Sequence, residues 1–329
     1  MQSKYLVFEK MYSETGRPSI PPEALLKGQL LIALFSIRSE RLFCEQLGYN
    51  FMYRWFLNMD NVDETFDATT FTKNRDRLMN HEVAVIFFDE VILEAKRQEW
   101  ISAEHFTVDG TLIEAWASMK SFRKDGKKAG PEDRDDNDEG NGYINFKGEK
   151  RSNETHQSTT DPEALLARKG KNKEVKLSYS ANVLMENRNG LCMDIKVKQA
   201  DGYAEREAAL ELIDRQRKKG IKPETVGGDK GYHTIGFVKE LRDRVIKPHI
   251  AQIKGKQTPG LDGRTTRHES YRVSQRVRKR IEEIFGWMKV IGGFRKTRYR
   301  GSTKTGMMGY IVGAAYNLLR MARLATVSP

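Results

Sequence analysis

Two aspartates stand where a strand-like apolar segment gives way to glycine: Asp109 in "VDGT" and Asp229 in "GGDKGY". Ligands and catalytic groups gather at the strand ends of an open α/β sheet, and a neighbouring glycine lets an ion or phosphate come close. If the two strands are neighbours, the pair can hold Mg²⁺, which prefers hard oxygen ligands and binds through few carboxylates. The alternative is that each aspartate only forms a turn.

A third acid is offered by "IEEIFGWMK", which follows a strongly basic run. At about 100° per residue on a helix, Arg278, Glu282 and Lys289 fall on one side, beside an apolar stripe. Glu283 projects about 100° further round, towards the outer face. This spacing leaves two interpretations of Glu282 open, an inward ligand or a helix residue that pairs with Arg278 and Lys289.

The first hundred residues have helical patterns. Helices are expected in "PPEALLKGQLLIALF", in "SERLFCEQLG" after a capping serine, from Thr69 in "TTFTKNRDRL", and from Glu82 to Gln98. Lys73, Arg75 and Arg77 lie close together on the third. The pattern fits a helix-turn-helix-like DNA reader and equally a small structural bundle.

After Trp100 the pattern becomes that of an α/β domain with a mixed sheet. "HFTVDGTLIEAWA" predicts a strand with Asp109 at its C-terminal end, and "ENRNG" predicts a hairpin turn between two further strands. A helix over 204–218, a strand at "TVGGDKGYH", a helix around 234–242, a strand at "VIKPHIAQ" and two closing helices follow. Residues 119–173 are charged and turn-rich, which predicts a surface insertion.

Composition narrows the class of protein. The net charge is +12, and the segment from Arg264 to Arg300 holds nine Arg and three Lys against three Glu, which favours a polyanionic partner. The only two cysteines form no CxxC pattern, so a disulfide framework or zinc site is not expected. No apolar run reaches the roughly 20 residues of a membrane span, and no signal-peptide pattern is seen. We expect a cytoplasmic protein without membrane contact.

Together these motifs resemble the DDE transposases of bacterial insertion sequences, in particular the insertion-sequence-five family. The resemblance rests on "TVDGT", "GGDKGY" and the spacing of Arg278, Glu282 and Lys289, and on "NETHQSTTDPEALLARK", "GGFRKTRYRG" and "DATTFTKNRDRL". It covers nearly the whole chain. One position departs from the family signature: the tyrosine expected three residues before Arg278 is Gln275, with Tyr271 the nearest tyrosine.

The resemblance implies an RNase H-like catalytic core with a mixed sheet over 101–329, preceded by an all-helical DNA-binding domain over 1–100. It implies that Asp109, Asp229 and Glu282 are catalytic and bind two ions of Mg²⁺ or Mn²⁺. The expected partner is double-stranded DNA, both transposon ends and target, in the bacterial nucleoid and with a homodimer in the synaptic complex. The residues expected to bind DNA are Arg278, Lys289, Lys73, Arg75, Arg295, Lys296 and Arg298.

The activity that follows is end binding, cleavage that exposes 3′-hydroxyls, and joining of those ends to target DNA by phosphoryl transfer with two metal ions. Two alternatives remain open from the sequence. One is an RNase H-like nuclease that cuts without joining, and the other is a catalytically inactive, transposase-derived DNA-binding regulator.

Overall fold

The computed structural model describes residues 20–80, 82–124, 151–170 and 173–327. The chain forms two compact units. One comprises Met1–Trp100, Glu283–Phe294 and Tyr310–Pro329, and the other comprises Ile101–Glu282 and Arg295–Gly309. The first unit therefore includes two C-terminal segments that the sequence analysis assigned to 101–329. The functional division, DNA binding before residue 100 and catalysis after it, stays a prediction.

The N-terminal part of the first unit is all helical in the described residues, as predicted. Its helices are α2 (Pro22–Leu34), α3 (Glu40–Gln46), α4 (Phe51–Phe56), α5 (Ala68–Asn80) and α6 (Val83–Arg97). Ser39 caps α3 by accepting a hydrogen bond from the Leu42 amide (3.1 Å), as the sequence suggested. Helix α4 was not predicted.

Close packing of aromatic rings against α2 holds these helices together. Gly28 lies in α2, and a Cβ at this position would come within 3.0 Å of the rings of Phe43 in α3 and Phe71 in α5. The two rings contact each other with centroids 5.4 Å apart. Phe88 of α6 meets Tyr310 of the long C-terminal helix α12 (Ser302–Val327), with ring centroids 5.3 Å apart. This contact explains why the end of α12 belongs to the first unit.

The second unit is built on a mixed sheet. Its strands are β1 (His105–Glu114), β4 (Leu165–Ala167), β5 (Lys176–Glu186), β6 (Leu191–Gln199), β7 (Thr225–Gly228) and β8 (Lys247–Ile250). Strand β5 lies between β1 and β6 and is antiparallel to both, while β7 and β8 add parallel to β1. The core order β6-β5-β1-β7-β8, three antiparallel strands followed by two parallel ones, is that of an RNase H-like fold, which confirms the predicted fold class.

One detail of β1 differs from the prediction. Asp109 does not end the strand, because antiparallel pairing with β5 continues to Glu114 opposite Ser178. On its other edge, however, β1 pairs with β7 only from His105 to Thr107. Asp109 therefore lies just beyond the end of the parallel ladder, in the middle of a longer strand.

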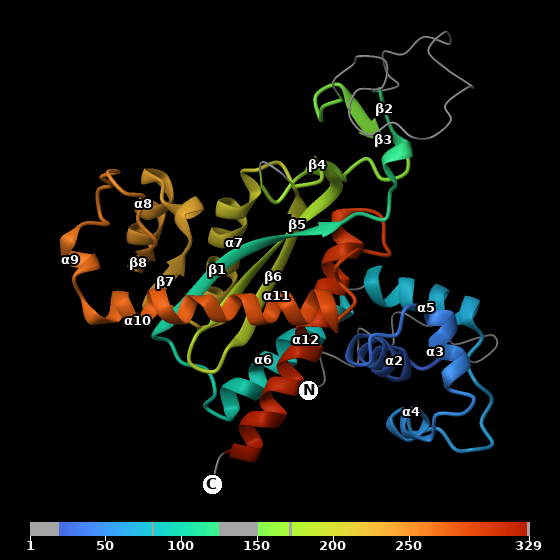
Figure 1. The fold of residues 1–329 in the computed structure, drawn as a ribbon. Coiled ribbons are helices and arrows are strands. Elements are labelled where there is room, and N and C mark those ends of the chain that lie inside the picture. Colours follow the sequence, from blue (N-terminus) through green and yellow to red (C-terminus); the bar gives the residue numbers. More distant parts are fainter. Residues whose placement is uncertain (1–19, 81, 125–150, 171–172, 328–329) are drawn as a thin grey trace. The chain divides into compact units, whose positions relative to one another are not determined.

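Helices cover both faces of this sheet (Figure 1). Helix α7 (Ala204–Lys218) contacts β5, β6 and β1, whereas α8 (Ile235–Asp243), α9 (Gly263–Thr266) and α10 (Glu269–Val277) contact β8. A Cβ at Gly227 would meet Ser274 of α10 at 3.3 Å, and one at Gly110 would meet Glu205 of α7 at 2.8 Å. Because side chains alternate between the faces of a strand, α7 and α10 lie on opposite faces of the sheet.

The predicted helix over "RVRKRIEEIFGWMK" is interrupted. Helix α10 ends at Val277, the 3₁₀ turn η4 (Arg278–Arg280) follows, and α11 runs from Ile281 to Val290. Arg280 donates from Nη1 to the carbonyl oxygens of Asn187 (2.8 Å) and Arg188 (2.6 Å) in the β5–β6 turn. Because a 3₁₀ turn advances about 120° per residue, the α-helical angle assumed between Arg278 and Glu282 does not apply.

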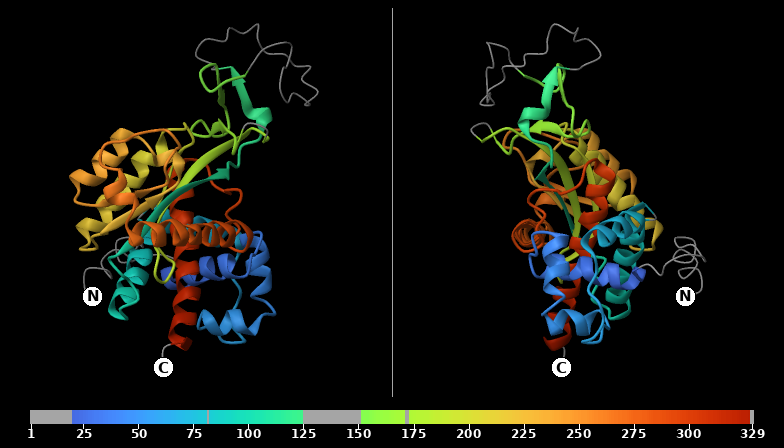
Figure 2. Two further views of the ribbon diagram at one scale, coloured as in Figure 1. Left: turned by 60° about the vertical axis from the view of Figure 1, so that its left-hand side comes forward. Right: turned by 90° about the vertical axis from the view of Figure 1, so that its right-hand side faces the viewer.

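The predicted surface insertion, about 119–173, lies largely outside the described residues. Its described parts contain η1 (Met119–Ser121) and the short antiparallel pair β2 (Phe122–Lys124) and β3 (His156–Ser158). This pair forms a separate small sheet that stands away from the main sheet of its unit (Figure 2). Across the described residues, every helix is too short or too polar to cross a membrane.

Candidate active site

Asp109 and Asp229 come from neighbouring parallel strands. Thr107 of β1 is in register with Gly227 of β7, and each aspartate follows two residues after that pair. Each is held by a nearby backbone amide: Asp109 Oδ1 accepts from Gly110 N (2.8 Å) and Asp229 Oδ1 from Gly231 N (2.7 Å). The condition that the two strands be neighbours is therefore met.

Asp109 is a half-buried carboxyl surrounded by other acids. Its pKa is raised to about 7: burial raises it most, the Gly110 amide opposes this shift, and the negative charges of Asp229, Glu205 and Glu282 also raise it. Asp229 and Glu282 thus both lie within electrostatic range of Asp109. A cation that binds among several carboxylates relieves the repulsion between their negative charges and so stabilises the cluster.

Glu282 lies in the first turn of α11 and is exposed, while the apolar positions predicted beside it, Ile281, Ile284, Phe285 and Met288, are buried. Arg278 donates from Nε to Gln275 Oε1 (3.1 Å), and the Gln275 amide nitrogen donates to the carbonyl oxygen of His249 in β8. Gln275, the position that departs from the family signature, thus positions Arg278 against the sheet, and this bond of Arg278 goes to Gln275 rather than to Glu282.

A fourth carboxylate, Glu205 in the first turn of α7, was not predicted from the sequence. Its Oε1 would lie 2.8 Å from a Cβ at Gly110, so a larger residue next to Asp109 would have to displace the Glu205 carboxylate. Burial and the charge of Asp229 raise the pKa of Glu205, and Arg206 opposes that shift. The sequence could have indicated Glu205 only as an acid in the first turn of the helix that follows β6. That Glu205 lies close to Gly110 depends on how α7 packs on the sheet.

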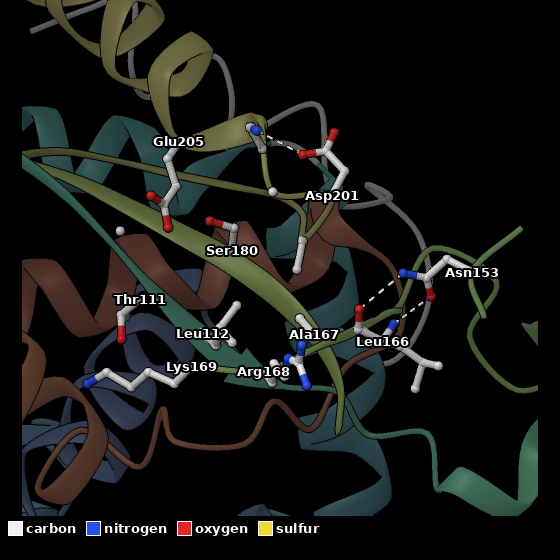
Figure 3. Close-up of a pocket in the computed structure, with 14 residues that line it drawn as sticks. Thr111, Leu112, Asn153, Leu166, Ala167, Arg168, Lys169, Ser180, Asp201 and Glu205 are labelled. Atoms are coloured by element: carbon white, nitrogen blue, oxygen red, sulfur yellow. Dashed lines mark hydrogen bonds between the residues drawn. The ribbon is translucent and has the colours of Figure 1, made fainter. Parts of the chain in front are cut away.

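A cleft of about 390 Å³ lies on the α7 side of the sheet, and Glu205 is the member of the acidic cluster that lines it. Figure 3 shows Glu205 on one side of this cleft near Ser180, and Arg168 and Lys169 on the opposite side. Asn153 fixes the β4 edge of the cleft through two hydrogen bonds with the backbone of Leu166 (3.0 and 2.7 Å). The cleft therefore has the Glu205 carboxylate and the basic side chains of Arg168 and Lys169 in one lining.

The donor set fits a hard divalent cation. Its groups are carboxylate oxygens, which Mg²⁺ and Mn²⁺ prefer, and the Asp109 and Asp229 side chains are each oriented by a backbone amide. In the described residues no group of three or more His, Cys, Asp or Glu side chains is arranged to hold a metal ion. These carboxylates therefore interact through charge, but they are not arranged around one position at which a metal ion would contact three of them.

The residues predicted to bind DNA have different environments. Lys73 on α5 and Arg295 are exposed. Lys296 forms an ion pair with Glu114 (3.1 Å), and Arg75 forms one with Glu40 (2.6 Å), where both side chains are only 12% exposed. Lys289 and Arg298 are half-buried. All of these DNA contacts, and that of Arg278, stay predictions.

Arg75 has a structural role, from which a stability prediction follows. Besides the Arg75 ion pair, Glu40 accepts hydrogen bonds from Gln29 Nε2 (3.0 Å) and Thr72 Oγ1 (2.6 Å). Replacing Arg75 by Gln should destabilise the helical unit by about 2 kcal/mol, since it leaves a largely buried carboxylate without its cation. Thermal unfolding followed by circular dichroism measures this, with the exposed Lys73→Gln as control. Equal melting temperatures for the two variants would contradict the structural role.

An RNase H-like sheet with clustered carboxylates is typical of enzymes that act on the phosphodiester bonds of nucleic acids. The chain belongs to the transposase DDE domain family, whose model matches residues 151–318. A second model, a transposase domain (DUF772), matches residues 3–77. Asp229 and Glu282 lie within the residues that the DDE domain model matches, whereas Asp109 lies between the residues matched by the two models. Membership of the insertion-sequence-five family stays a prediction.

Two solved structures illustrate the similarity. The piggyBac transposase synaptic complex with hairpin DNA is 11% identical, with 97% of this chain and 71% of that chain covered and a TM-score of 0.41. The Mos1 transposase paired-end complex with the left transposon end is 11% identical, with 93% and 82% covered and a TM-score of 0.23. Among curated proteins there is no match. The family assignment therefore rests on the two sequence models.

Proposed function

We propose that this transposase binds the inverted-repeat ends of an insertion sequence, cleaves them to expose 3′-hydroxyls and joins those ends to target DNA. The catalytic groups are Asp109, Asp229 and Glu282. The observation that supports this best is the acidic cluster itself: two aspartates follow the same rung of neighbouring parallel strands, and the charges of Asp229 and Glu282 both act on Asp109.

The carboxylates would hold two divalent ions, Mg²⁺ or Mn²⁺. When bound, such ions polarise a phosphate oxygen and make a coordinated water or hydroxyl a better nucleophile. The backbone amides of Gly110 and Gly231 each occupy one oxygen of an aspartate and so fix its orientation. Glu205 adds a fourth negative charge beside Asp109, which strengthens the preference of the site for cations.

The same site can serve two successive displacements at phosphorus. In the first, water attacks the phosphodiester, a new P–O bond forms, and the bond to the 3′-oxygen breaks to leave a 3′-hydroxyl. In the second, that hydroxyl attacks a target phosphodiester, and the target strand's own 3′-oxygen leaves. No covalent enzyme intermediate is needed. Arg278, positioned by Gln275, would bind a phosphate bidentately, and Lys289, two helical turns beyond Glu282, would offer a compact charge.

The partner in this proposal is double-stranded DNA, as in the piggyBac and Mos1 complexes named above. Because two ends must be cut and joined together, the working complex contains at least two copies of the chain, and we propose a homodimer. The cytoplasm, in association with the nucleoid, is the compartment where such DNA is found. The other DNA-binding residues proposed are Lys73, Arg75, Arg295, Lys296 and Arg298.

Strand joining separates this function from that of a nuclease. A duplex that ends in a precut 3′-hydroxyl should be joined to supercoiled plasmid in the presence of Mg²⁺, and the product should be visible as labelled plasmid on a gel. An otherwise identical duplex ending in a 3′-deoxy nucleotide is the control and should give no product. Cleavage of uncut ends without any joining would favour the nuclease, and end binding without either reaction would favour the regulator.

A further inference from the structure

A second cleft, of about 460 Å³, lies at the other end of α10 from Glu282. Its lining includes Arg242 of α8, Lys247 and His249 of β8, and Arg264 and His268 near the start of α10. Asp262 is the one acid in this lining, and it is already bound to Arg264 (2.8 Å). The cleft therefore has a net positive charge and none of the catalytic acids.

The cations of this cleft are available and partly fixed. Arg242 donates from Nε to Gly260 O (3.0 Å) and from Nη2 to Thr265 Oγ1 (2.6 Å), which holds the guanidinium in place. The printed hydrogen bonds of Arg242 use only its Nε and Nη2 atoms, and the Lys247 side chain is exposed. A fixed guanidinium beside an exposed ammonium suits a phosphate group.

Two further observations show that the cleft favours an anion. The pKa of His249 is lowered to about 4 by burial first and then by the positive charges of His105, Lys247, Arg242 and His268. The N-terminus of α10 also opens here, and no side chain caps it at His268, so first-turn N–H groups add to the positive potential. Only the part of this pKa shift that comes from the neighbouring charges indicates a positive electrostatic potential beside His249.

The cleft lies on the same face of the sheet as the catalytic aspartates. His249 is in register with Gly227, which is in register with Thr107, and Asp109 and Asp229 each follow two residues later. By strand alternation all these side chains point to the α10 face. From Ser270 to Glu282 the path is roughly 20 Å, at about 1.5 Å per α-helical residue and about 2 Å per residue through η4. That length corresponds to about six base pairs of duplex at about 3.4 Å each.

We propose that this cleft, formed by Arg242, Lys247 and the start of α10, binds backbone phosphates of the DNA duplex, one at Arg242 and one at Lys247, about six base pairs from the phosphodiester that is cut. The inference rests on the proposed function, since it takes the carboxylates as the place of cleavage. It adds a contact outside the residues otherwise proposed to bind DNA, and it sets the position of the duplex along α10.

The test compares the salt dependence of DNA binding for the wild-type protein and the variant Arg242→Gln/Lys247→Gln, with a 30-base-pair duplex spanning an element end. Loss of two phosphate contacts should reduce the slope of log affinity against log salt by about 1.8. The ratio of wild-type to variant affinity should then shrink about twelvefold between 50 and 200 mM salt. Lys247→Gln alone, which removes an exposed side chain, should reduce the slope by about 0.9.

A control variant, Lys222→Gln/Lys239→Gln, removes the same charge from two exposed positions outside the cleft. An equal slope change in this control would overturn the proposal, because net charge alone would explain it. A duplex with only three base pairs on each side of the cut should bind the wild type and the cleft variant with the same slope. A persisting difference would overturn the assigned position.

Free phosphate is the competing source of the anion. If inorganic phosphate raises the melting temperature of the wild type but not of the cleft variant, and the DNA slopes stay equal, the cleft binds free anions and the DNA assignment is wrong. A wild-type protein that does not cleave element ends would instead contradict the proposed function. Wild-type cleavage with no effect of the cleft substitutions on the slope contradicts only this inference.

Discussion

Asp109→Asn, Asp229→Asn and Glu282→Gln should each reduce Mg²⁺-dependent cleavage of element ends by at least about a thousandfold, which corresponds to roughly 4 kcal/mol of transition-state stabilisation. Each substitution removes one charge from a site whose acids already influence one another electrostatically. End binding should change by less than about threefold, because the phosphate contacts are made by cations. A gel assay of a labelled end measures cleavage, and fluorescence anisotropy measures binding.

Glu283→Gln is the matched control for this prediction. Glu283 is exposed, adjoins Glu282 in α11 and is not among the charges that raise the pKa of Asp109. Cleavage by this variant should stay within about twofold of the wild type. Calorimetric titration with Mn²⁺ gives a second readout, in which the three active-site variants should bind the metal more weakly. Full cleavage by Glu282→Gln, or an equal loss in Glu283→Gln, would falsify the assignment of Glu282.

Local sequence signals predicted most elements of the second unit. "ENRNG" predicted the β5–β6 hairpin from its turn-forming residues. In the structure, Gly190 has a positive φ of 70°, and the Glu186 carboxylate accepts hydrogen bonds from the amides of Arg188 and Asn189. The helix over 204–218 has the predicted bounds. In contrast, α4 has only six residues, which is too short for a helical period to be recognised.

The misplaced features depend on contacts between distant residues. The length of β1 follows from its pairing with β5, about 70 residues later, and the break at η4 coincides with the bonds of Arg280 to the β5–β6 turn, 93 and 92 residues away. Glu205 is brought to Asp109 only by the packing of α7. The spacing of Arg278, Glu282 and Lys289 marked the correct segment, but the family resemblance rather than helical geometry selected Glu282.

Asp194 is a buried acid with an ion-pair partner, so removal of that partner gives a clear stability prediction. Its side chain, in β6, is 2% exposed and forms an ion pair with Arg215 of α7, while Gln216 Nε2 (3.1 Å) and the Ile195 amide (2.8 Å) also donate to it. Burial raises the pKa of Asp194, and Arg215 opposes that shift. Arg215→Met should therefore reduce the free energy of unfolding by about 3 kcal/mol at neutral pH, since the charged carboxylate loses its counterion.

The pH dependence of this loss has a defined sign. A carboxyl whose folded pKa exceeds its unfolded pKa is least costly below the unfolded pKa, where it is protonated in both states, and its cost grows as pH rises towards the folded pKa. Removing Arg215 raises the folded pKa further, so the deficit of Arg215→Met should be smaller at pH 5 than at pH 7.5. Urea denaturation followed by circular dichroism at the two pH values measures it. Lys218→Met, an exposed position on the same helix, should change stability by less than about 0.5 kcal/mol.

A double variant separates the charge from the packing of the Arg215 side chain. Asp194→Asn/Arg215→Met removes the carboxylate as well as its partner, and it should recover most of the stability lost in Arg215→Met at pH 7.5. The recovery should vanish towards pH 5, because a protonated Asp194 already resembles the amide in charge. A loss that is equal at both pH values and that the second substitution does not relieve would show that Arg215 acts through contacts of its aliphatic chain with α7 and β6, and not by neutralising Asp194.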